Sequence, residues 1–170
     1  SAAGLDYLLR RNAPAVGPED VPDRIAPLVR EHQRPEPQLK AGRLLIESGV
    51  RCALNDVSDG LASEAWEIAE ASGGCLVLDE SRIPIDDEVR AYALETGRDP
   101  LAWALYGGED YRLVGTLPAE RLADMEERFR RAGLQFYPIG RVGDGPPSVR
   151  LRRRDGSEEP VAKRGYNHFG

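Results

Sequence analysis

The chain is poor in the residues that mark several whole classes of protein. Among 170 residues it has two cysteines, Cys52 and Cys75, two histidines and one methionine. Two cysteines in a chain of this length make no disulfide framework and show no zinc-type spacing, so we expect both to be small buried apolar residues. No apolar run approaches the ~20 residues that span a bilayer, and no signal peptide is evident. These absences predict a cytoplasmic protein with no membrane partner.

The balance of charge excludes further partners. With 23 Lys and Arg against 29 Asp and Glu, the net charge is −6, which argues against nucleic acid or an anionic membrane as the main ligand. The length, with 41% hydrophobic and 31% charged residues, is typical of one globular domain with a real core. An acidic protein can still bind nucleotides when divalent cations mediate the contact.

The most informative stretch is Leu54–Gly60, with the sequence Leu-Asn-Asp-Val-Ser-Asp-Gly. The residues before it are β-prone and those after it favour a helix, so the stretch predicts a strand end, a tight turn and a helix start. On a strand Asp56 and Ser58 would share a face, and Asp59 would cap the helix. Carboxylates suit Mg²⁺ and helix N-termini suit phosphate, which indicates a metal-bound nucleotide phosphate. The alternative is an ordinary helix-start turn in which these side chains only cap.

A second candidate site follows a short helix that Asp99 and Pro100 are expected to start. Gly107 and Gly108 would end this helix by adopting positive φ, and two acids, Glu109–Asp110, follow at the mouth of a predicted strand. Adjacent acids after paired glycines point to a function, although glycine ends helices in many proteins without one.

The rest of the chain predicts alternating helices and strands. Residues 31–38 read as a proline-rich linker that holds His32, which we interpret as an exposed loop imidazole. The arginines of the run 150–154 would protect the edge of a strand against aggregation. Helices are predicted over the first dozen residues, 19–29, 39–48, 59–72, 87–95, 100–107 and 118–132, and strands over 50–54, 75–78, 111–117, 136–142 and 149–153.

Three motifs taken together resemble one known family. The segments 56–60, 107–111 and 165–169 (Asp-Val-Ser-Asp-Gly, Gly-Gly-Glu-Asp-Tyr and Gly-Tyr-Asn-His-Phe) are similar to thiamine-monophosphate kinase in content, order and spacing. The linker 32–37 resembles the proline-rich lead-in of that family. The resemblance covers the whole chain, as the C-terminal half of a member of the aminoimidazole-ribonucleotide-synthetase-like superfamily.

This resemblance carries expectations about fold and partners. It implies an α/β (α+β) layered sandwich, with a mixed sheet flanked by helices and partly ferredoxin-like topology. Residues 1–38 would be a helical lead-in and linker from an N-terminal domain, and 39–170 the C-terminal domain. The family transfers the γ-phosphate of ATP to thiamine monophosphate with Mg²⁺ and is homodimeric. Because the other half supplies most of the ATP site, this chain alone is expected to be inactive.

The resemblance also assigns roles to individual residues. Asp56 and Asp59 would bind Mg²⁺, Ser58 would contact a nucleotide phosphate, and Glu109 and Phe169 would bind thiamine monophosphate.

The chain departs from the family pattern at Gln38, Asn55 and Arg112, where a basic, an apolar and an acidic residue are more usual. Two alternatives stay open: another ATP-using member of the superfamily with a different phosphoacceptor, and a non-catalytic binding or dimerisation module.

Overall fold

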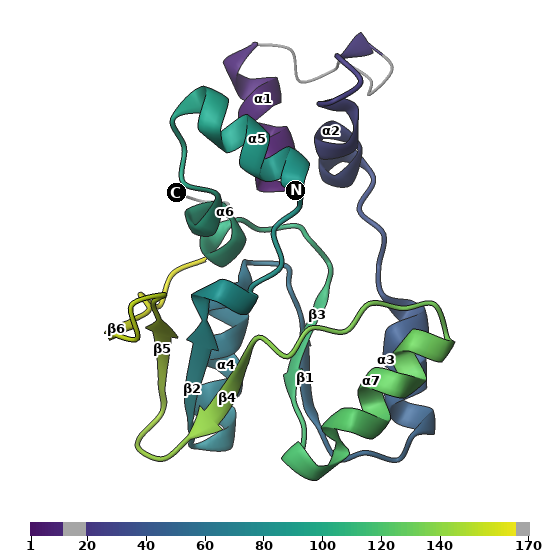
Figure 1. Ribbon diagram of the computed structural model, residues 1–170, viewed down its shortest axis with the longest axis vertical. Coiled ribbons are helices and arrows are strands. Elements are labelled where there is room, and N and C mark those ends of the chain that lie inside the picture. Colours follow the sequence, from purple (N-terminus) through teal and green to yellow (C-terminus); the bar gives the residue numbers. More distant parts are fainter. Residues whose placement is uncertain (12–19, 166–170) are drawn as a thin grey trace.

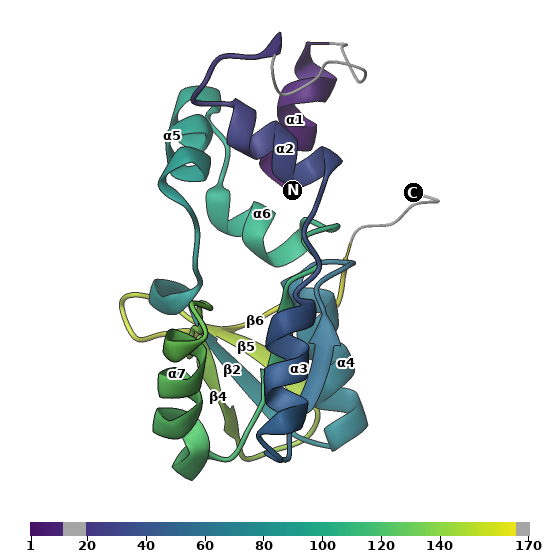
Figure 2. The same cartoon turned by 90° about the vertical axis from the view of Figure 1, so that its right-hand side faces the viewer.

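The computed structural model describes residues 1–11 and 20–165 of the chain. Figures 1 and 2 show a helical layer at one end of the molecule and the strands, covered by further helices, at the other. The helical layer consists of α1 (Ala2–Arg10), α2 (Ala26–Gln33), α5 (Asp87–Thr96) and α6 (Pro100–Tyr106).

The helical layer has a core of its own. Leu8, Leu28 and Val29 are buried in it, and Tyr92 stacks on Trp103 with ring centroids 5.8 Å apart. Helices α1 and α2 approach closely at Gly4, where a Cβ atom would lie 2.1 Å from the carbonyl oxygen of Leu28. Helices α1 and α2 therefore pack directly against α5, and α1 also packs against α6, while the division into a lead-in and a domain at residue 38 stays a prediction.

The strands form two sheets with mixed pairing. In the first, β1 pairs antiparallel with β3 and Asp56 lies opposite Leu113. The second has the order β4-β2-β5-β6, in which β2 and β5 are parallel and the other pairs antiparallel. The strands are β1 (Ala53–Asp56), β2 (Cys75–Asp79), β3 (Leu113–Thr116), β4 (Gly140–Gly143), β5 (Ser148–Arg152) and β6 (Glu158–Pro160).

Helices α3 (Leu39–Glu47), α4 (Leu61–Ser72) and α7 (Leu122–Arg131) cover these strands. α4 buries an apolar face that includes Ala62, Ala65 and Ile68 against β2 and β5, and so forms the centre of the main core. The chain runs β1-α4-β2 and later β3-α7-β4, two β-α-β segments whose first strands pair in one sheet and whose second strands pair in the other. The expected α/β fold with a mixed sheet and flanking helices is thus confirmed.

Several local expectations were wrong. α2 begins at Ala26 rather than near residue 19, and it extends through Gln33, so His32 lies on a helix and not in a linker. Cys75 is buried as expected, but Cys52 is exposed in the loop before β1. Residues 158–160 form a strand that the sequence did not reveal, because its Glu-Glu-Pro has no β-prone residue.

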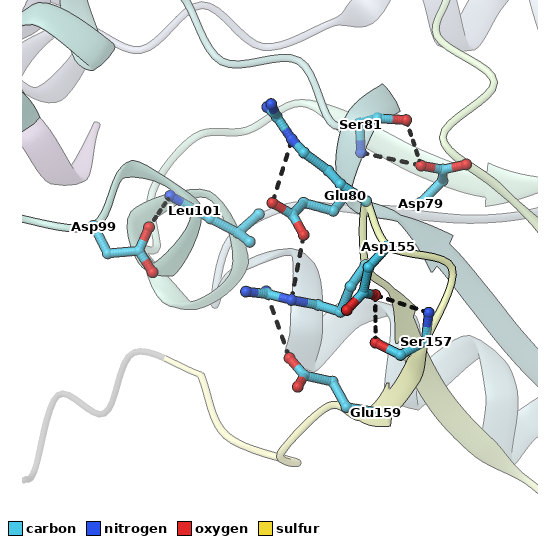
Figure 3. Close-up of polar contacts among 10 residues, drawn as sticks. Asp79, Glu80, Ser81, Asp99, Leu101, Asp155, Ser157 and Glu159 are labelled. Atoms are coloured by element: carbon cyan, nitrogen blue, oxygen red, sulfur yellow. Dashed lines mark hydrogen bonds and ion pairs between the residues drawn. The ribbon is translucent and has the colours of Figure 1, made fainter.

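That additional strand changes the interpretation of the arginine run. β6 covers β5 on the side away from β2, so β5 is an interior strand and its arginines do not guard an edge. Instead they meet carboxylates: Arg152 donates to Asp79 at 2.6 Å, and Arg153 and Arg154 both lie within 3.5 Å of Glu80. Figure 3 shows Glu80 between two guanidinium groups, beside Asp79 and its bonds from Ser81.

We predict that Asp79 makes the stability of this protein depend on acid pH. Hydrogen bonds from Ser81, then from Arg152, lower its pKa from 3.8 to about 2. A carboxyl with a depressed pKa stabilises the fold above its unfolded pKa, and that contribution is lost as the pH falls through the folded pKa. The melting temperature of the wild type should therefore drop more steeply between about pH 4 and about pH 2 than that of Asp79→Asn.

The matched control is Asp144→Asn, which changes an exposed aspartate with no hydrogen bond or ion pair in the described part of the chain. This variant should keep the steep acid dependence of the wild type. Parallel curves for the wild type and Asp79→Asn would contradict the prediction.

Candidate functional site

The two candidate motifs are joined through their backbones. The amide of Glu109 donates to the carbonyl oxygen of Ser58 at 2.6 Å, and the amides of Asp110 and Tyr111 donate to that of Val57 at 3.2 and 2.9 Å. The pairing of β1 with β3 explains this, because it brings the end of β1 next to the start of β3. The two motifs, about 50 residues apart in the sequence, are therefore held next to each other.

The second motif is strained at its polar residues. Glu109 and Tyr111 have φ values of 62° and 50°, which only about a few per cent of non-glycine residues adopt. Each such residue costs roughly 1–3 kcal/mol, and strain of this kind is concentrated at functional sites. Gly107 has φ −78°, so the expectation that the paired glycines supply the positive φ was wrong. Its role is close packing, because a Cβ atom there would lie 2.6 Å from the Trp103 carbonyl oxygen.

The turn of the first motif also differs from the expectation. The strand ends at Asp56, so Ser58 does not continue it, and the N-cap of α4 is Gly60 rather than Asp59. Gly60 has φ 105° and ψ 150°, a region essentially restricted to glycine. A Cβ atom on it would lie 3.0–3.1 Å from backbone atoms of Leu105 and Gly107. The turn is therefore packed against the end of α6.

The carboxylates of the first motif have no protein partner. Asp56 is exposed and Asp59 is half-buried, and neither side chain, nor that of Ser58, has a hydrogen bond or ion pair within the residues described. Across residues 1–11 and 20–165, no group of three or more His, Cys, Asp or Glu forms a complete metal site. The two carboxylates fit Mg²⁺ in the manner typical of that ion, which is held by one or two carboxylates together with substrate phosphates and water.

Sequence reasoning missed a third carboxylate at this turn. Glu64 on α4 is buried, with 4% of its surface exposed, and it accepts hydrogen bonds from the Asp59 amide at 3.2 Å and from the Asn55 side chain at 2.9 Å. Burial raises the pKa of Glu64. Asn55 also donates to Glu67 at 3.0 Å, so the unusual amide at position 55 holds two acids of α4 beside the turn.

Glu109 lies at a hollow and beside a histidine. The hollow has a volume of about 210 Å³, is lined by α1, Trp103 and the segment 107–109, and does not include Asp56, Ser58 or Asp59. Nδ1 of His32 is 3.7 Å from Oε2 of Glu109 and 3.0 Å from Oγ of Ser1. Burial lowers the pKa of His32 from its usual value, which favours the neutral imidazole. The expectation of an exposed loop imidazole was thus wrong, because His32 lies on α2 and is half-buried.

The C-terminal segment runs along α4 to the same turn. Trp66 donates from Nε1 to the carbonyl oxygen of Val161 at 3.0 Å, and the Arg164 guanidinium lies 4.3 Å from the ring centroid of Tyr106. At Gly165 a Cβ atom would lie 2.4 Å from the Asp59 carbonyl oxygen, so the segment reaches the first motif itself. Phe169, expected to bind substrate, lies outside the described residues.

Comparison with known proteins assigns the chain to a family. The profile of the family described as AIR synthase related protein, C-terminal domain, matches residues 11–152. The chain belongs to this family. Thiamine-monophosphate kinase of Bacillus subtilis is 37% identical over 169 residues, which is 99% of this chain and 49% of the relative.

Solved structures agree in fold. The structure described as AaThiL complexed with AMPPCP and TMP superposes with a TM-score of 0.76 at 30% identity and covers 98% of this chain and 47% of its own. Thiamine-monophosphate kinase from Stenotrophomonas maltophilia K279a gives a TM-score of 0.76 at 29% identity, with 91% and 46% covered. The chain thus spans about half the length of these members of the AIR synthase-related family. No helix of the described residues is long and apolar enough to cross a membrane.

We predict that Gly60→Ala destabilises the domain by about 2–3 kcal/mol, because the added Cβ combines a disallowed backbone conformation with backbone contacts. Gly97→Ala is the matched control: Gly97 also has positive φ, 65°, but a Cβ atom there meets nothing within 4 Å. That variant should cost only about 1 kcal/mol. Denaturant unfolding measures both, and equal losses would contradict the close-packed turn.

Proposed function

We propose that this chain is the C-terminal domain of a thiamine-monophosphate kinase, which as a whole protein transfers the γ-phosphate of ATP to thiamine monophosphate, giving thiamine diphosphate and ADP. The observation that carries the proposal is the direct backbone bonding of the Asp56–Gly60 turn to the Glu109 loop. This bonding supports the proposal because the turn proposed to hold phosphate and metal lies next to the loop proposed to bind the substrate. Relatives called thiamine-monophosphate kinase, and a similar structure holding AMPPCP and TMP, support this choice of substrates.

Phosphoryl transfer depends on positioning and on neutralising charge more than on covalent chemistry. The partnerless carboxylates of Asp56 and Asp59 would hold Mg²⁺, which lowers the repulsion between the phosphates it joins. Ser58 has a hydroxyl without a partner in the described residues, next to the N-terminus of α4, where phosphate oxygens are favourably bound. Glu64 would keep the turn in place through the amide of Asp59.

Glu109 would recognise the other substrate. Thiamine monophosphate carries a cationic ring and an amino-bearing ring, both of which a carboxylate attracts. Glu109 lines the hollow against α1, where part of such a molecule has room. The packing of Phe169 on the substrate stays a prediction. It is supported by the course of the preceding segment, in which Gly165 lies against the backbone of Asp59.

The remaining expectations belong to the proposal as well. The domain would work together with an N-terminal domain in a homodimer, would be inactive without it, and would act in the cytoplasm. Mg²⁺ is the cofactor proposed and ATP the co-substrate, with neither nucleic acid nor membrane as partner.

We predict that the full-length protein forms ADP from ATP, Mg²⁺ and thiamine monophosphate, and that Asp56→Asn and Asp59→Asn each lower kcat about 100-fold or more. A cation that loses a carboxylate ligand stabilises the transition state less, by several kcal/mol, and each 1.36 kcal/mol is about tenfold in rate. ADP release measures the effect.

Asp144→Asn, an exposed aspartate remote from both motifs, is the matched control and should leave kcat unchanged. If the wild type makes ADP with another phosphoacceptor only, the chain is a different kinase of the family. If the wild type is active but both site variants turn over normally, the domain is a scaffold without metal ligands.

A further inference from the structure

The Glu109 loop is held by α2 as well as by the first motif. On one side its amides donate to the backbone carbonyl oxygens of Val57 and Ser58. From the other side two neighbouring residues of α2 approach it: His32 faces Glu109 at 3.7 Å, and Glu31 accepts from Arg112 at 3.1 Å. The backbone nitrogen of Ser1 lies 2.7 Å from Asp110. The helical layer thus contacts the strained segment at three places.

These contacts differ in burial, and burial decides which of them matters. In the pair of Arg112 and Glu31 the side chains are 51% and 45% exposed, and exposed ion pairs contribute little. The His32 side chain is only 17% exposed and that of Glu109 38%. A shielded imidazole restricts the carboxylate beside it far more than a solvated guanidinium restricts a solvated acid.

We propose that His32 is a positioning residue that holds the Glu109 carboxylate toward the hollow and so sets the affinity for the cationic substrate. The inference rests on the proposed function. The nitrogen concerned is Nδ1, since this atom faces both Glu109 and the hydroxyl of Ser1. Next to a carboxylate, a neutral imidazole carries its proton on the facing nitrogen. Nδ1–H then donates to Oγ of Ser1 at 3.0 Å and attracts Oε2 of Glu109 electrostatically at 3.7 Å.

The geometry predicts a separation of kinetic constants. Without the imidazole, Glu109 loses its fixed orientation while the Asp56–Gly60 turn keeps its own contacts, because within the described residues no hydrogen bond of that turn involves α2. In the full-length protein, His32→Ala should raise KM for thiamine monophosphate about tenfold. KM for ATP should stay within about twofold of the wild type, and so should kcat. A general loss of structure would instead change all three constants.

The test compares three substitutions at position 32 and one beside it. In His32→Asn the amide nitrogen occupies nearly the position of Nδ1, so this variant should restore the KM for thiamine monophosphate to within about threefold of the wild type. In His32→Gln the amide reaches the position of Nε2 and should not rescue. Glu31→Gln, on the same helix turn, breaks only the exposed pair with Arg112 and should change that KM less than twofold.

The outcomes separate this inference from the proposed function. A wild-type protein that forms no thiamine diphosphate overturns the proposed function and the inference with it. If the wild type is active and His32→Ala binds thiamine monophosphate as tightly as the wild type does, by calorimetric titration, the inference alone is overturned. Equal rescue by Asn and Gln overturns the assignment to Nδ1.

Discussion

The structure depends on the hydrogen bonds from the amides of Glu109, Asp110 and Tyr111 to the carbonyl oxygens of Val57 and Ser58. They extend the ladder of β1 and β3 past the ends of both strands, to the point where α4 begins and α6 ends. A two-stranded ladder is marginal in isolation. Here it is secured by the main core, which includes Val57 of the turn, Leu61 at the start of α4 and Leu105 of α6. The residues proposed to carry the chemistry are therefore attached to the main core.

Close backbone packing makes the strain around this site tolerable. Gly60 brings the turn against the end of α6, Gly107 fits beneath Trp103, and Gly165 brings the C-terminal segment against Asp59. At each of these positions a Cβ atom would lie too close to neighbouring backbone atoms, so only glycine fits without a shift of the backbone. Glu109 and Tyr111 keep their unfavourable φ values because their neighbours fix the loop from both sides.

The polar side chains divide into paired and partnerless groups, and the division follows their position. On β5, β6 and the segment after β2, arginines and carboxylates pair with one another. At the turn, Asp56 and Asp59 have no such partner in the described residues. Carboxylates that are not paired within the protein are free to bind a cation. An acidic chain can in this way present an anion-binding site, provided that the cation accompanies the phosphate.

The sequence by itself determined the elements with local signals. Asp99 and Pro100 start α6, with Asp99 accepting from the Leu101 amide at 2.9 Å, and the apolar spacing of α4 and α7 gave both helices. The sequence also marked the two motifs, because their acids and glycines stand out along the chain even when their spatial neighbours are unknown. Only the tertiary structure decided that Gly60 and not Asp59 caps α4, that β6 makes β5 an interior strand, and that His32 lies beside Glu109 and Glu64 beside Asp59. These are relations between distant segments, and a histidine or a glutamate on a helix has no local feature that reports what lies across from it.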